Sequence, residues 1–288
     1  MPYLDLFTRN SVPSTVNRED RDYLPAYQLT TKWTDSIITR AAYSETVSRP
    51  DFKELSTATY TDDERGVDVV GNENLESTVI RSIDLRTEWY GVGKDVFSIG
   101  VFQKNFDRPI ESIIRPGTEG KLSFDNALSA QNRGLELEFN KSLRFISRRI
   151  EPLSIGGNFS WIKSEITLDP AKSGVLTNEN RPLQGQSPYV YNLNIDYDNK
   201  DTGTIITLLY NIFGERISDV GSGGAPDIVE QPFAQLDLVA SQKLSKNFSL
   251  KFKLKNLIDP EAQRTQGTEI TELYRKGREA GVALSGSF

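Results

Sequence analysis

Apolar and polar residues alternate along most of this chain with a period of two. From 189 to 198, aromatic and aliphatic side chains occupy every second position, and mainly Asn and Asp lie between them. Segments 82–89, 134–140 and 248–255 repeat the alternation. Successive side chains of a β-strand point to opposite faces, so the pattern predicts strands with one apolar and one polar face. No comparable segment has the period of an amphipathic helix.

The alternating segments predict an all-β antiparallel up-and-down meander of about twelve strands. Several exceed the roughly 5–6 residues usual for soluble strands and match the roughly 9–11 that a tilted strand needs to cross a bilayer. The predicted strands are 2–9, 24–33, 36–47, 78–90, 94–106, 130–143, 152–166, 188–198, 203–213, 233–244, 247–257 and 277–288.

Short and long connections alternate between these strands. In a meander every second connection lies on the same side, so one side would carry tight turns and the other long loops, as in transmembrane β-barrels of the outer membrane. A soluble antiparallel sandwich or barrel is the alternative, because its strands also alternate. The short connections are 34–35, 91–93, 144–151, 199–202 and 245–246; the long ones are 10–23, 48–77, 107–129, 167–187, 214–232 and 258–276.

Composition narrows the chemistry that the chain can perform. The 288 residues contain no Cys and no His, which excludes thiolate chemistry and a Ser-His-Asp mechanism. A net charge of −6 argues against general nucleic-acid binding. The longest apolar segment, 204–213, is about half the roughly 20 residues of a membrane helix. The residues predict no enzyme activity, no cofactor and no metal site.

Short motifs in a fixed order then suggest a family. In order, they resemble the C-terminal part of the barrel of TonB-dependent outer-membrane receptors, and together they cover nearly the whole chain. The motifs are the segments 43–55, ending in Arg-Pro-Asp-Phe-Lys-Glu-Leu, 71–75 (Gly-Asn-Glu-Asn-Leu), 83–90, 100–110, 132–139 (Asn-Arg-Gly-Leu-Glu-Leu-Glu-Phe), 183–193, 210–216, 256–259 and the terminal strand ending in Phe288.

The resemblance implies a bacterial outer-membrane transport receptor that makes or breaks no bond. Such receptors bind a scarce nutrient, which can be a siderophore, cobalamin or an oligosaccharide, and import it with TonB-supplied energy. They have a barrel of about 22 strands around an N-terminal plug domain. Neither a plug nor a signal peptide is recognised here, so we expect residues 1–288 to be the C-terminal part of such a barrel. A free-standing twelve-stranded barrel is the structural alternative, because open edges are costly in lipid.

The same resemblance implies which partners this protein has. They are outer-membrane lipid, an extracellular small-molecule or glycan ligand, the TonB system acting through a plug domain, and the barrel-assembly machinery. A soluble all-β carbohydrate-binding or adhesion domain is the functional alternative.

Candidate site residues lie in the long connections and at the C-terminus. Arg115, Arg181 and Tyr274 are candidate ligand contacts, because long polar and aromatic loop side chains commonly serve in binding. Phe288 ends the last strand on its apolar face and is, by resemblance, the barrel-assembly signal.

Three further charge patterns have structural interpretations. Glu136 and Glu138 lie on one strand face at the spacing of a glycosidase carboxylate pair, but charges facing a hydrated lumen are the preferred interpretation. Asp237 is expected to form a cross-strand ion pair with Lys253 or Lys255. The acidic segment 61–64 is interpreted as a solvated loop in preference to a cation site.

Overall fold

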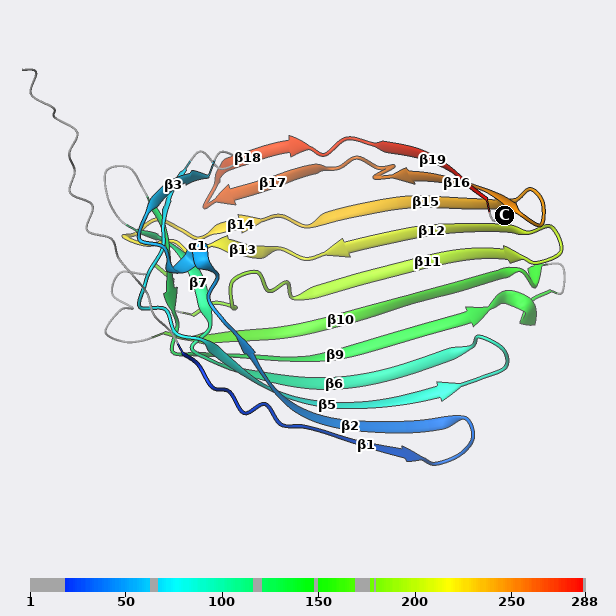
Figure 1. Cartoon of the computed structure of the whole chain (residues 1–288), viewed down its shortest axis with the longest axis horizontal. Coiled ribbons are helices and arrows are strands. Elements are labelled where there is room, and N and C mark those ends of the chain that lie inside the picture. The colour runs from blue at the N-terminus through cyan, green and yellow to red at the C-terminus, as the bar shows by residue number, and fades with distance from the viewer. Residues whose placement is uncertain are drawn as a thin grey trace, which may run out of the picture.

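The dominant element is one antiparallel sheet of eleven strands, which we call the wall (Figure 1). The structure, a computed structural model, describes residues 19–62, 67–115, 121–147, 150–168, 177–178 and 180–286. The wall strands, in spatial order, are β1 (Ala26–Lys32), β2 (Ile37–Ser48), β5 (Thr78–Tyr90), β6 (Val96–Asp107), β9 (Ser129–Ser142), β10 (Leu153–Thr167), β11 (Tyr189–Asn199), β12 (Thr204–Phe213), β15 (Phe233–Lys243), β16 (Phe248–Lys255) and β19 (Glu279–Gly286).

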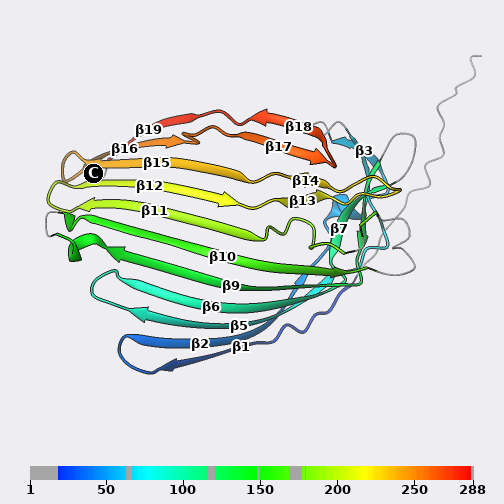
Figure 2. The ribbon, with the colours of Figure 1, turned by 180° about the vertical axis from the view of Figure 1, so that it is seen from behind.

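The wall confirms the predicted meander. Eleven of the twelve predicted strands are present in the predicted order, and β5 has the predicted bounds of 78–90. The remaining predicted strand, 2–9, lies outside the described residues. The connections 33–36, 91–95, 143–152, 200–203 and 244–247 lie together at one end of the wall, on the right in Figure 1 and on the left in Figure 2. We call this end the turn end and the opposite one the cap end.

One face of the wall is apolar across consecutive strands. In the strand register, Leu137 lies opposite Ile99 on one side and Phe159 on the other. Ile195 lies in the same way between Ile155 and Leu208. None of these apolar side chains is buried, and Ile99 and Ile195 are 45% and 41% exposed. Such a large apolar surface is unfavourable in water and matches the lipid-facing side of a membrane barrel. We call it the outer face.

The opposite, inner face carries a shared ion-pair network. Glu88 accepts hydrogen bonds from Arg40 (3.2 Å), Arg86 (3.0 Å) and the Tyr90 hydroxyl (2.9 Å). Arg86 reaches on to Glu138 of β9, so the network joins β2, β5 and β9. The Glu88 side chain is only 8% exposed, and burying it is tolerated because two guanidinium groups and a hydroxyl donate to it. Polar pairing thus links three strands on the face opposite the apolar one.

The long connections differ from the prediction, because most contain strands. One four-stranded sheet has the order β13-β14-β17-β18 and the other has the order β3-β4-β8-β7. The sequence pattern missed them because each strand has only three to seven residues, which is too short for a clear alternation. Their bounds are β3 (Thr59–Asp62), β4 (Val67–Val70), β7 (Ile110–Arg115), β8 (Lys121–Asn126), β13 (Arg216–Asp219), β14 (Ile228–Glu230), β17 (Glu261–Gln266) and β18 (Glu269–Arg275).

Helical structure is minor. In the part of the chain that the structure describes, the helical elements with defined bounds are α1 (Phe52–Leu55) and the 3₁₀ turn η1 (Leu143–Phe145). Among the described residues, no helix is long and apolar enough to span a bilayer.

Buried apolar residues concentrate at the cap end, where the small sheets meet the wall. Ala127, Ala130 and Ile166 form one cluster, which Phe106 and Leu183 extend. Across the rest of the wall the protein is a single sheet thick, so its side chains have no second layer to pack against. The packed core therefore lies at the cap end, where the long connections leave the wall strands.

The predicted ion pair between Asp237 and Lys253 or Lys255 is wrong. The hairpin register pairs Leu238 with Leu254, which places Asp237 opposite Lys255 and not Lys253. The Asp237 carboxylate nevertheless accepts from the Asn256 backbone N–H (2.8 Å), while Lys255 pairs with Glu279 of β19 (3.1 Å). The edge strand β19 supplies a closer carboxylate, which a hairpin considered alone could not show.

Candidate functional site

Three chain segments meet over the inner face at the cap end, and we call them the cap. They are the β7–β8 hairpin, the segment 177–188 before β11, and the β13–β14 hairpin. Figures 1 and 2 both show β7 running across the strands at this end of the wall. Ile113 forms a parallel bridge with Val220, and the Ile114 N–H donates to the Val220 carbonyl (3.1 Å). Backbone pairing therefore links two hairpins that lie about a hundred residues apart in sequence.

A buried ion pair lies at the centre of the cap. The guanidinium of Arg181 donates to both carboxylate oxygens of Glu111, each at 2.8 Å. Their side chains are 0% and 3% exposed. Two parallel charge-assisted bonds in a desolvated site have strong directional preference. The Arg181 Nε is buried without a hydrogen-bond partner, so the pair is not fully satisfied. The pair fixes the segment before β11 to the β7 strand.

Gln184 adds a second connection between the same segments. Its backbone N–H donates to Glu111 (3.0 Å), and its side-chain oxygen accepts from the Ser112 N–H (2.7 Å). Its side-chain NH₂ donates to the Ser112 hydroxyl and to the Ser218 carbonyl. One side chain thus contacts both β7 and β13, and all three parts of the cap are cross-linked.

The cap is also anchored to the inner face of the wall. The Asn132 amide donates to Gln186 (2.7 Å), and the Leu183 N–H donates to the Ser164 hydroxyl (3.0 Å). Asn132 and Ser164 lie opposite each other on the polar face of β9 and β10. These bonds place the cap over the polar side of the sheet.

Comparison with known proteins agrees with a barrel-type arrangement of the wall and the cap. A family model described as TonB dependent receptor-like, beta-barrel, matches residues 3–257. The chain belongs to this family. No curated protein matches it in sequence.

Solved structures of TonB-dependent receptors have the same fold. The ferric enterobactin receptor PfeA of Pseudomonas aeruginosa, solved with enterobactin, is similar with a TM-score of 0.62 at 19% identity, over 93% of this chain and 41% of its own. The siderophore receptor PirA of Acinetobacter baumannii has a TM-score of 0.61 at 14% identity, over 93% and 41% of the two chains. The ferric-catecholate import receptor Fiu of E. coli K12 has a TM-score of 0.57 at 12% identity, over 90% and 34%. This chain spans about two fifths of the length of the first of them.

The predicted ligand contacts of this TonB-dependent receptor barrel lie in different environments. Arg181 is enclosed by Glu111, so contact with a ligand would require the cap to open. Tyr274 lies on β18 and is 44% exposed. Arg115 ends β7, and its side chain is outside the described residues, as is Phe288. The structure does not bring these residues into one site, and their roles remain predictions.

The sequence analysis missed Glu111 and Gln184, which hold the cap together. Glu111 stands between Ile110 and Ser112 in a short segment that also contains Ile113 and Ile114, and a carboxylate in this Ile-rich segment was the available signal of a buried partner. The carboxylates of Glu136 and Glu138 lie on the inner face as interpreted, with Glu138 bound to Arg86. Of the acidic segment 61–64, Thr61 donates to Asp68 (2.9 Å), and residues 63–64 lie outside the described residues.

At the turn end, Asp95 links the 91–95 connection to β9. Its carboxylate accepts from the Lys141 ammonium and from the Ser142 backbone N–H (2.9 Å). These two hydrogen bonds lower the pKa of Asp95 below its ordinary value, against the opposing effect of burial. The connection is therefore held by an acceptor that stays ionised at neutral pH.

Proposed function

We propose that this chain forms part of the lumen wall and the extracellular cap of an outer-membrane receptor for TonB-dependent nutrient uptake. The observation that carries the proposal is the division of the wall into an exposed apolar outer face and a polar, ion-paired inner face. Lipid outside and a hydrated lumen inside explain both faces together. The chain would contribute binding and gated passage, with no covalent chemistry.

The placement of connections supports the orientation. Short connections at one end and long structured ones at the other are the asymmetry of outer-membrane barrels, with the short turns in the periplasm. The cap would then face the medium and lie where an entering ligand first meets the protein. The soluble carbohydrate-binding alternative is less favourable, because residues such as Leu193 and Phe252 would remain 38% and 44% exposed to water.

The ligand is proposed only as a class. The structural neighbours are described as siderophore receptors, which makes a ferric siderophore the first ligand to test, with cobalamin and oligosaccharides as the other two. In a strain that depends on the receptor containing this chain, growth on one of the three should require both the receptor and a working TonB system. Growth that continues without TonB would overturn the proposal.

Sidedness can be tested in intact cells by cysteine labelling, because the chain has no native Cys to give background. Thr268→Cys, at the tip between β17 and β18, should react with a membrane-impermeant maleimide added outside. Asp201→Cys, in a short connection, should react only after the outer membrane is opened. Phe252→Cys on the outer face is the matched control and should be protected by lipid in both conditions. Equal labelling of Phe252→Cys and Thr268→Cys would favour the soluble alternative.

A further inference from the structure

The apolar surface of the outer face ends in a group of polar side chains near the cap end. Three adjacent strands, β6, β9 and β10, each place two polar side chains there in register, directly beyond the apolar row of Val101, Leu135 and Trp161. The group lies in the middle of the wall, so neither further strands at its edges nor a domain inside a lumen would cover it. The six residues, which we call the border cluster, are Gln103, Asn105, Gln131, Arg133, Lys163 and Glu165.

The spacing of charges along β9 places the border cluster at the edge of a bilayer. The eight residues from Arg133 to Lys141 span about 26 Å along the strand, or roughly 20 Å along the membrane normal at a tilt of about 40°. The apolar band of an outer-membrane barrel is about 25 Å tall, so Arg133 lies at the level of the lipid headgroups. Trp161, one row inside the band, is 56% exposed, and aromatic side chains are favoured at this interface. The outer-face residues between the two charges are apolar: Leu135, Leu137 and Phe139.

The border cluster carries more positive than negative charge. The Arg133 guanidinium lies 3.8 Å from a carboxylate oxygen of Glu165, and the Lys163 ammonium pairs with the same oxygen. All three side chains are more than half exposed. On the neighbouring strands the charges balance, because Arg81 pairs one-to-one with Glu45 at 3.7 Å. Two cations of the border cluster therefore share one carboxylate, which leaves a net positive charge at headgroup level.

Two amides in the border cluster add hydrogen-bond donors beside these cations. The Gln131 amide donates to the Asn105 side-chain oxygen at 2.8 Å, and the Gln103 amide donates to the same oxygen at 3.3 Å. Gln131 lies directly opposite Glu165, and Gln103 lies directly opposite Arg133. An amide NH₂ carries two N–H groups, so one of each can turn to an anionic oxygen. Cations flanked by amide donors are a suitable set for a phosphate group.

We propose that the border cluster binds the phosphate group of a lipid in the membrane leaflet on the cap side. Arg133 presents the planar donor pair that matches phosphate oxygens, and Lys163 adds a second cation from the next strand. A phosphomonoester carries about −1.5 to −2 charge at neutral pH, so it competes favourably with the single charge of Glu165 for these two cations. The apolar row at Trp161 then contacts the acyl chains below the headgroup.

This inference rests on the proposed placement of the wall in the outer membrane, and the two can fail separately. The cysteine labelling of Phe252→Cys and Thr268→Cys tests the placement at residues far from the border cluster. A wall that passes the labelling test but shows no phosphate preference would retain the proposed function and lose the lipid site.

The test uses the full chain in non-ionic detergent micelles, with Trp161 as the reporter. Trp33→Phe and Trp89→Phe leave Trp161 as the single tryptophan of the chain. Phosphatidic acid with brominated acyl chains is titrated into the micelles, because bromine quenches a nearby indole. The measured quantity is the lipid mole fraction that gives half-maximal quenching.

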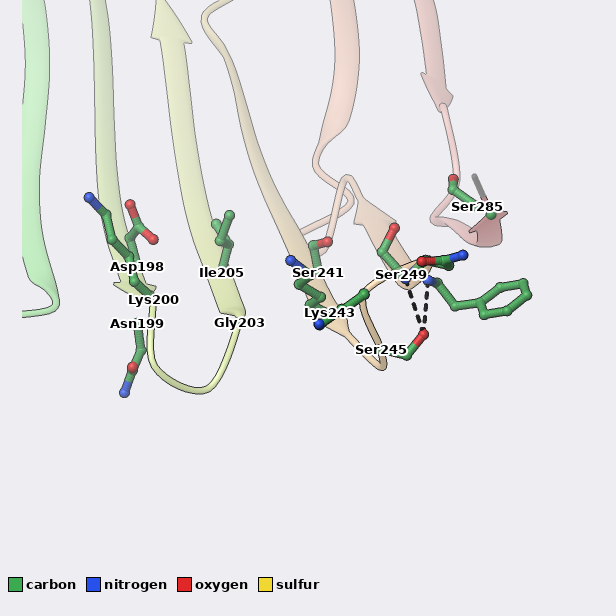
Figure 3. Close-up of a pocket in the computed structure, with 14 residues that line it drawn as sticks. Asp198, Asn199, Lys200, Gly203, Ile205, Ser241, Lys243, Ser245, Ser249 and Ser285 are labelled. Atoms are coloured by element: carbon green, nitrogen blue, oxygen red, sulfur yellow. Dashed lines mark hydrogen bonds between the residues drawn. The ribbon is translucent and has the colours of Figure 1, made fainter. Parts of the chain in front are cut away.

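Three variants in this background separate the phosphate site from general charge. Arg133→Gln/Lys163→Gln should raise the half-quenching mole fraction about tenfold, because it loses two exposed charge pairs with the phosphate. Glu165→Gln should lower it severalfold, because it removes the carboxylate that competes with the phosphate. The matched control Lys200→Gln/Lys243→Gln removes two cations at the turn end of the wall, where Figure 3 shows them, and should leave it unchanged.

Four results would overturn the proposal. An equal shift in both double variants would mean that binding follows net charge alone. Equal quenching by brominated phosphatidylcholine, whose choline offsets the phosphate charge, would mean that only the acyl chains bind. Relief of quenching by inorganic phosphate at the concentration of the lipid would indicate a site for the free anion. Unchanged or weaker binding in Glu165→Gln would contradict the competition. A β-rich circular dichroism spectrum shared by all variants shows that each has folded.

Discussion

Glu111→Gln should loosen the cap while leaving the wall intact. The substitution preserves shape but removes the charge that compensates the fully buried Arg181 guanidinium. Removing one partner of a buried ion pair typically costs about 3–5 kcal/mol, because the remaining charge stays desolvated. The wall has its own hydrogen-bonded ladders on both sides of most strands, so the loss should appear as local opening of the cap.

Hydrogen exchange with mass spectrometry, on the chain in detergent micelles, measures this local opening. A loss of about 3–5 kcal/mol corresponds to roughly two to nearly four orders of magnitude faster exchange, if the amide opens locally. The reporting amides are those of Ser112, Gln184 and Val220, all bonded within the cap. Amides in the centre of β9 and β10 serve as the internal reference and should not change.

Two further variants decide whether buried charge is the cause. Glu230→Gln breaks the half-exposed pair with Arg216 in the same cap and should cost no more than about 1 kcal/mol. The double variant Glu111→Leu/Arg181→Met removes both charges and should recover most of the protection, because apolar replacement of a buried pair is often neutral. Slow cap exchange in Glu111→Gln, or equally fast exchange in the double variant, would refute the reasoning.

The remaining predictions concern lipid contact, pH and assembly. Spin labels at Phe252 and Lys253 should respond to lipid-soluble and water-soluble quenchers respectively, and the reverse result would mean that the register is shifted by one residue. The pKa of Asp95 is lower in the folded state than in the unfolded state. The stabilisation that the Asp95 carboxylate provides is therefore present above the unfolded-state pKa and is lost as the pH falls through the folded-state pKa. The protection of amides in the 91–95 connection, relative to the intrinsic exchange rate at each pH, should therefore fall below about pH 4, and Asp95→Asn should abolish that loss of protection. Deleting Phe288 should reduce outer-membrane assembly of the receptor far more than Ser287→Ala does, and equal assembly of the two variants would remove the assembly-signal assignment.

The wall could be predicted from the sequence because its physical constraint repeats at every second residue. Each strand must present apolar groups to one side and polar groups to the other. The alternation within a segment such as 248–255 is therefore enough to identify that segment as a strand. The predicted ion pair of Asp237 failed because alternation assigns residues to faces but does not show which charged neighbour lies closest, and Lys255 instead pairs with Glu279 of β19. The alternation between short and long connections then fixed the direction of every strand.

The cap could not be predicted in the same way because long-range pairs hold it together. Arg181 and Glu111 are separated by 70 residues, and their neighbouring sequences show no periodic pattern that would join them. Arg181 was expected to contact ligand because long polar side chains in loops are usually exposed, whereas the structure surrounds it with protein. The carboxylate of Glu111, in the Ile-rich segment 110–114, was the one local sign in the sequence that an internal cation was required.

The wall has an odd number of strands, and this limits how a barrel that contains it can close. Consecutive wall strands are antiparallel, so the first and the eleventh, β1 and β19, both run towards the turn end. Direct pairing of these two edges would be parallel, whereas single-chain bacterial barrels use an even number of antiparallel strands. Closure therefore requires an odd number of further strands, and the one beside β1 must run towards the cap end. The predicted strand 2–9, which lies outside the described residues, would have this direction and would make the count even. A closed barrel of eleven strands is therefore excluded. Each added strand would also pair edge N–H and C=O groups, which cost several kcal/mol each when they are left unpaired in lipid.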